Sequence, residues 1–150
     1  MATTVGTESK VTDLLSNLIS LDYDAIEAYE AAINKLDNAD VKAKLIEFKG
    51  DHERHTRDLA GLLREFGGQP PKGGDMKRFM TAGKVAFANM FGDRAILQAM
   101  KTNEDDTNKA YERAVGHDGE LTEQARAVLR TNLDDERRHR AWIEDTIATM

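Results

Sequence analysis

The stretch Asp135-Glu136-Arg137-Arg138-His139 places a carboxylate and an imidazole three residues apart, at Glu136 and His139. On an α-helix this spacing sets both side chains on one face, one turn apart. A Glu-x-x-His pair that points into a helical bundle can bind one side of a metal centre. Such pairs also occur by chance on solvated helices, so the rest of the chain decides how much this one means.

A closely similar stretch, DHERH, occupies residues 51–55 in the first half of the chain. The repeat extends further, because AYEAAI at residues 28–33 matches AYERAV at residues 110–115. Each half is therefore predicted to be one helical hairpin, with its polar residues at matching places. The alignment pairs Asp22 with Glu104, Tyr29 with Tyr111, Asp51 with Asp135, His52 with Glu136, and His55 with His139.

The composition limits the class of protein. The chain has 150 residues, enough for one domain with a core, and its net charge of -6 argues against a nucleic-acid partner. No apolar run approaches the length of a membrane span, and the N-terminus lacks the pattern of a secretory signal, so we expect a cytoplasmic protein. Because there is no cysteine, any metal must be bound by nitrogen and oxygen ligands.

Apolar residues recur every three or four positions in four long stretches, which predicts an all-α protein. We expect helices at about residues 7–37, 40–66, 93–116 and 121–150. Short loops within each half make successive helices antiparallel neighbours, and a long crossover joins the two hairpins. Within the crossover, residues 76–90 are predicted to form a short fifth helix. Residues 1–6 are expected to be a flexible arm ahead of a single domain over residues 7–150.

Ionisable residues interrupt the core-facing stripe near the middle of each long helix. Burying their carboxylates without compensation costs several kcal/mol each, and no inward Lys or Arg lies at that level. Divalent cations remove this cost, whereas a protonated, water-filled polar cluster is the alternative. We predict a metal centre with these ligands: Asp22, His52, His55, Glu104, Glu136 and His139.

This arrangement resembles the ferritin-like superfamily of di-iron carboxylate bundles, over nearly all of the chain after the N-terminal arm. In overall pattern the chain is similar to small bacterial ferritin-like proteins of unassigned function, related to the rubrerythrin and bacterioferritin branches. The resemblance rests on the motif at residues 135–139, on a carboxylate from the first and third helices, and on the long crossover. It implies an antiparallel four-helix bundle of two hairpins with two bound iron ions.

Position by position, the resemblance implies ligand roles for Glu104, Glu136 and His139, and His55 matches the histidine of the other hairpin. The counterparts of Asp51 and Asp135 are carboxylates that orient the ligating imidazoles.

Two positions depart from that pattern. Asp22 stands in place of a glutamate and reaches one methylene less far, so it binds directly, through water, or not at all. Glu27 is a nearby alternative but falls well off the core stripe. His52 replaces a bridging glutamate, which leaves a choice between one and two metal ions and gives two ions a net positive charge. This nitrogen-rich set admits Fe, Mn or Zn.

Tyr29 and Tyr111 lie two turns beyond the first- and third-helix carboxylates on the same faces, and they are the candidate catalytic residues. They can hydrogen-bond the ligand carboxylates or relay single electrons. Simple core packing is the other interpretation.

The expected function is that of a non-haem iron protein of the oxidase or peroxidase type. Its substrate would be dioxygen or peroxide, and its role oxidative or general stress protection. The alternatives are a metal-binding or oxygen-sensing bundle without turnover, and a structural stress protein with a degenerate site. A homodimer through the crossover is compatible with the sequence, whereas nothing in it predicts the contacts of an iron-storage shell.

Overall fold

The computed structural model describes residues 3–71, 87 and 89–150. Within these residues the regular structure is helical and contains no strand, as predicted. The long helices are α1 (Val11–Lys35), α2 (Ala39–Glu65), α4 (Asp93–Val115) and α5 (Glu123–Ala148). Their ends differ from the predicted ones by up to four residues. The predicted short helix at residues 76–90 falls almost wholly outside the described part of the chain.

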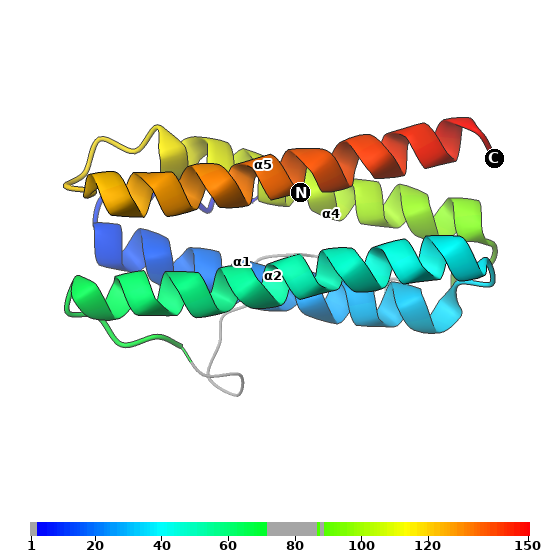
Figure 1. The fold of residues 1–150 in the computed structure, drawn as a ribbon, viewed down its shortest axis with the longest axis horizontal. Helices are drawn as coiled ribbons and strands as arrows, with labels where there is room; N and C mark the ends of the chain where they lie inside the picture. Colours follow the sequence, from blue (N-terminus) through cyan, green and yellow to red (C-terminus); the bar gives the residue numbers. More distant parts are fainter. Residues whose placement is uncertain (1–2, 72–86, 88) are drawn as a thin grey trace.

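The four helices form an antiparallel bundle (Figure 1). α1 packs against α2 and α4, and α5 packs against α4 and α2. The α1–α2 turn and the α4–α5 turn lie at opposite ends of the bundle in Figure 1, so α2 ends and α4 begins at opposite ends as well. This is the bundle of two hairpins joined by a crossover that the repeat predicted.

Two side chains near the α1–α2 turn make short polar contacts with the backbone. The Asn38 side chain accepts hydrogen bonds from the backbone N–H groups of Asp40 and Val41, and it thereby caps α2. The carboxylate of Asp93, the first residue of α4, accepts hydrogen bonds from the N–H groups of Asp37 and Asn38 at 2.9 Å. It thereby joins the α1–α2 turn to the start of the second hairpin.

The apolar core is divided into two clusters, one toward each end of the bundle. One is built from the start of α1, the end of α2, the end of α4 and the start of α5. The other is built from the opposite halves of the same helices. Each fully buried leucine or phenylalanine contributes about 1.5–3 kcal/mol to folding. Because the two clusters lie toward opposite ends of the bundle, they enclose its middle, where the polar residues lie.

The start of the chain packs on α4. Thr3 and Val5 are buried, and Arg113 donates hydrogen bonds to both of their carbonyl oxygens, at 2.7 and 3.2 Å. Gly6 has a φ of 103°, and a Cβ there would lie 2.3 Å from the Cβ of Arg113. Residues 3–6 of the expected flexible arm are thus held in place by the guanidinium of Arg113 and by the burial of Val5. Among the described residues no helix is long and apolar enough to cross a membrane.

Candidate metal centre

The six predicted ligands meet in the middle of the bundle, between the two apolar clusters. Each side chain is at most 1% exposed. α1 and α4 contribute one carboxylate each, α2 two histidines, and α5 a glutamate and a histidine. Two overlapping groups of four have ligand atoms close enough to hold a metal ion. Glu27, the alternative to Asp22, is not a member of either group.

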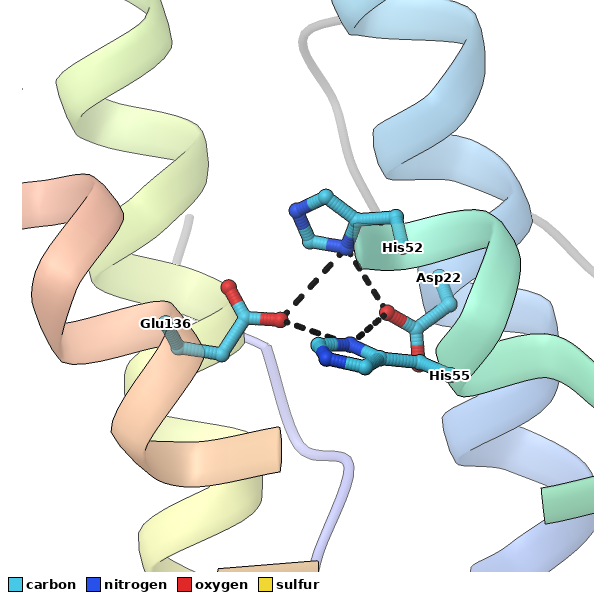
Figure 2. A group of neighbouring side chains, drawn as sticks. All are labelled: Asp22, His52, His55 and Glu136. Atoms are coloured by element: carbon cyan, nitrogen blue, oxygen red, sulfur yellow. Dashed lines mark hydrogen bonds and ion pairs between the residues drawn. The ribbon is translucent and has the colours of Figure 1, made fainter. Parts of the chain in front are cut away.

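The first group consists of Asp22, His52, His55 and Glu136 (Figure 2). Asp22 Oδ1 lies 2.8 Å from His52 Nδ1 and 3.2 Å from His55 Nδ1. Glu136 Oε1 lies 3.4 Å from each of the same two nitrogens. Ligands about 2.1 Å from a tetrahedral ion are about 3.4 Å apart, so these separations suit one ion. Asp22 therefore reaches the group despite its shorter side chain.

The second group consists of His52, Glu104, Glu136 and His139. Glu104 Oε1 lies 3.6 Å from His52 Nε2 and 3.6 Å from His139 Nδ1. His139 Nδ1 lies 3.7 Å from Glu136 Oε2. The separations are slightly larger than in the first group, and the two groups share His52 and Glu136.

Three polar atoms of these groups are buried without a hydrogen-bond partner in the described part of the chain. They are His52 Nε2, Glu136 Oε1 and His139 Nδ1. A buried polar atom left unpaired costs about 1–3 kcal/mol. All three atoms face the other members of their groups, and a cation between them would remove the cost. The donor set therefore fits a metal of the kind that binds nitrogen and oxygen.

Two aspartates lie within hydrogen-bonding distance of the Nε2 atoms of two histidine rings. His55 Nε2 lies 3.0 Å from Asp135, and His139 Nε2 lies 2.8 Å from Asp51. Each aspartate thus contacts the histidine of the other hairpin. With Nε2 as the proton donor, Nδ1 is left to face the interior as a ligand.

Two arginines neutralise these aspartates at the surface of the α2–α5 seam. Arg138 lies 2.6 Å from Asp51, and Arg54 pairs with Asp135 across the same seam. The two arginines occupy matching positions of the repeat and were not among the predicted site residues. The signal was available in the repeated Asp-x-x-Arg spacing at residues 51–54 and 135–138, which sets each arginine one turn from an aspartate.

The two candidate tyrosines also cross between hairpins. Tyr29 donates a hydrogen bond to Glu104, and Tyr111 donates to Asp22 at 2.5 Å. Both hydroxyls are buried, and burial together with the charge of the accepting carboxylate raises the pKa of each tyrosine well above its ordinary value. The hydroxyls therefore keep their protons and remain donors.

Thr107 is a further contact of the site and was not among the predicted site residues. Its hydroxyl lies 2.9 Å from Glu136 Oε2 and 3.3 Å from Glu104 Oε2. Asn108 donates to the backbone carbonyls of Glu104 and Glu136, which ties α4 to α5 at this level. A threonine three residues after Glu104, in a stripe otherwise apolar, was the available signal.

The carboxylates around the histidines raise the histidine pKa values. Burial by itself lowers the pKa of His52, but the charge of Glu136 and the hydrogen bond with Asp22 outweigh it and raise that pKa to about 9. Burial is likewise outweighed at His55, where Asp22 and Asp135 raise the pKa to about 12.

The same balance governs the other half of the site. Burial opposes, but the charge of Glu104 and the hydrogen bond to Asp51 raise the pKa of His139 to about 11. Burial raises the pKa of Glu104, but the charge of His139 and its hydrogen bond outweigh this effect and hold that pKa well below its ordinary value. Burial likewise raises the pKa of Asp51, but the contacts with His139 and Arg138 hold it well below its ordinary value. Protons on the rings thus compensate the buried carboxylates, and a metal ion must displace them to bind.

Comparisons with known proteins agree with this architecture. No curated protein matches the chain. A solved structure described as a dodecameric thioferritin, the bacterioferritin-related protein from Bacteroides fragilis, shares the fold with a TM-score of 0.72. Its sequence is 15% identical, and the match covers 92% of this chain and 84% of that chain. The fold is therefore ferritin-like, with buried clusters able to hold metal. The model of the family described as "Domain of unknown function (DUF2383)" matches residues 10–117, and the chain belongs to that family.

Proposed function

We propose that this protein binds two metal ions, with iron as the expected metal, and reacts with dioxygen or peroxide. The observation that carries the proposal is the pair of overlapping buried groups, which share His52 and Glu136. Either group alone supplies four ligand atoms, and together they offer two adjacent sites. Mn and Zn fit the same nitrogen and oxygen donors.

The burial of the site limits the substrate. All six side chains are at most 1% exposed, and apolar clusters lie on both sides of them. A large organic substrate would have to open the bundle, whereas dioxygen and peroxide are small enough to enter through side-chain motion. This favours chemistry on the oxidant itself, with protection against oxidative stress as the proposed role.

Bound iron would supply the redox change and the Lewis acidity of the reaction. The protein supplies orientation, because Asp51 and Asp135 hold two imidazole rings with Nδ1 facing inward. Tyr29 and Tyr111 keep a proton next to the carboxylates of Glu104 and Asp22. We propose that these hydroxyls hold the carboxylates of Glu104 and Asp22 in place. We also propose that they donate a proton or an electron next to these carboxylates during the reaction.

The decisive experiment begins with elemental analysis of protein purified without added metal. Fe(II)-loaded protein is then mixed rapidly with dioxygen or peroxide, and iron oxidation is followed by absorbance. His139→Ala should lose iron binding and turnover. His117→Ala is the matched control, because His117 lies in the α4–α5 loop and contacts the backbone of Glu8 instead of the site. Turnover no faster in the wild type than in His139→Ala would refute the proposed reaction.

The same burial also supports a second function, in which the bundle holds metal or senses oxygen without turnover. Tight, stoichiometric metal binding with no catalytic oxidation would establish that function. A degenerate structural bundle would instead show an unchanged melting temperature with and without Fe, Mn or Zn, because a ligand specific for the folded state must raise stability.

Self-association is part of the proposal. The thioferritin of similar fold is described as dodecameric, and we propose that this chain also forms a homo-oligomer, of which a homodimer is the simplest case. Light scattering after size-exclusion chromatography gives the mass directly, and a monomer at micromolar concentration would refute this point alone.

A further inference from the structure

We propose that His52 is a bridging ligand, which binds one metal ion through Nδ1 and a second through Nε2. This inference rests on the proposed two-metal function and specifies how the two ions are joined. It follows from the position of one imidazole ring between the two groups of ligands, both of which include His52.

The Nδ1 atom of His52 belongs to the first group. It lies 2.8 Å from Asp22 Oδ1 and 3.4 Å from Glu136 Oε1, and the nitrogen of His55 completes that group. Figure 2 shows this nitrogen facing Asp22 and Glu136, while the second nitrogen lies on the side of the ring away from Asp22.

The Nε2 atom of His52 belongs to the second group. It lies 3.6 Å from Glu104 Oε1, and that oxygen lies 3.6 Å from His139 Nδ1. His52 Nε2 and His139 Nδ1 are both buried without a hydrogen-bond partner among the residues described. Two unpaired nitrogens and one carboxylate oxygen thus face one another on the far side of the His52 ring from Asp22.

Glu136 is the other shared residue, and it offers Oε1 to the first group and Oε2 to the second. The His52 ring and the Glu136 carboxylate therefore each connect the two groups. By contrast, His55 and His139 each turn one nitrogen inward and give the other to an aspartate, at 3.0 and 2.8 Å. Among the three histidines of the site, only His52 has both nitrogens directed at ligand groups.

The charge of the site agrees with a bridge. An imidazole that binds metal through both nitrogens has released its N–H protons to solvent and counts as an anion. With the carboxylates of Asp22, Glu104 and Glu136, it supplies four negative charges to two divalent ions. The buried centre is then neutral, which avoids the cost of an uncompensated charge in the core.

Cu(II) is a suitable probe, because it binds nitrogen and oxygen sites most tightly among the divalent first-row metals and carries one unpaired electron. Protein loaded with Cu(II) is examined for stoichiometry by elemental analysis and for spin coupling by low-temperature electron paramagnetic resonance. We expect two ions per chain and an integrated signal well below that of two isolated ions. His52→Gln should restore the uncoupled signal. His117→Gln should keep the coupling, because His117 contacts the backbone of Glu8 and lies outside both groups of ligands.

An uncoupled pair in the wild type, or coupling that survives in His52→Gln, would overturn the bridge. One ion per chain would overturn it while leaving metal binding intact, and no bound metal would also refute the proposed function. If His52→Gln does not fold, a crystal structure of the Zn(II)-loaded wild type decides the question. The bridge requires a zinc ion on each ring nitrogen and a separation beyond the roughly 3.5–4 Å usual in two-metal sites.

Discussion

His139 on α5 lies 2.8 Å, through its Nε2 atom, from the carboxylate of Asp51 on α2. The mirror contact joins His55 on α2 to Asp135 on α5 at 3.0 Å. Each hairpin thus supplies the aspartate that orients a histidine of the other hairpin. The pair of contacts both fixes the inward nitrogens and holds α2 against α5 at the level of the site.

Asp51→Asn and Asp135→Asn should each weaken metal binding about 10–100-fold, the usual effect of losing a group that orients a ligating histidine. An asparagine can present its NH2 group to the ring, which favours the wrong tautomer. The measurement is the dissociation constant for Zn(II) by competition with a chelator. Asp134→Asn is the control, because Asp134 is exposed and adjacent in sequence. Equal affinity in all three variants would contradict the orienting role.

Tyr29→Phe and Tyr111→Phe should each lower the free energy of unfolding by about 1.5–3 kcal/mol, because each removes a hydrogen bond to a buried carboxylate. If the tyrosines also act in turnover, Fe(II) oxidation slows while bound iron per chain stays constant. Chemical denaturation and rapid mixing measure the two effects. Tyr23→Phe is the matched control, since Tyr23 is only half-buried and packs against the apolar cluster at one end of the bundle. A loss in the control as large as in the others would show that the effect is not specific to the site.

Thr107→Val keeps the shape of the side chain but removes the donor that lies 2.9 Å from Glu136. We expect a loss of about 1–3 kcal/mol in the metal-free protein, because the carboxylate oxygen stays buried without that donor. Thr131→Val serves as the control, since the Thr131 side chain is exposed and its hydroxyl donates to the backbone carbonyl of Ala127. Thermal unfolding of both variants gives the comparison, and a Thr107→Val protein as stable as the wild type would contradict the prediction.

The stability of the metal-free protein should fall as the pH rises above about 6.5. The pKa of His52 is raised from 6.5 to about 9 and that of His55 from 6.5 to about 12. Because the folded pKa exceeds the unfolded one, each contribution is complete below pH 6.5 and is lost as the pH rises through the folded value. Asp22 affects stability at low pH, because its pKa is lowered from 3.8 to about 2 on folding. Its contribution to stability is lost as the pH drops through that range.

The melting temperature of the metal-free protein should therefore be highest between about pH 4 and 6.5 and should decline toward pH 9. His55→Gln removes one of the raised pKa values, so its decline should be shallower. Circular dichroism melts across this range provide the test. A melting temperature that rises from pH 6.5 to 9, or an equally steep decline in His55→Gln, would contradict the assignment.

Much of the fold was predictable, because the positions of Leu15, Leu18, Leu45 and Leu129 follow a local helical period that needs no knowledge of partners. The six candidate ligands were found in the same way, as ionisable residues in otherwise apolar stripes. The contacts of Thr3 and Val5 with Arg113 were not predictable, because they join residues more than 100 positions apart.

Helical periodicity and the internal repeat are properties of the chain alone, so the two hairpins and the level at which the ionisable residues meet follow from them. Which side chains contact one another across the hairpins depends on how the four helices pack. Asp51 could face either His55 or His139, and His52 could turn either nitrogen toward Asp22, until packing of the four helices fixed each rotamer. Those choices depend on atoms from distant parts of the chain, and they determine how a metal would be held.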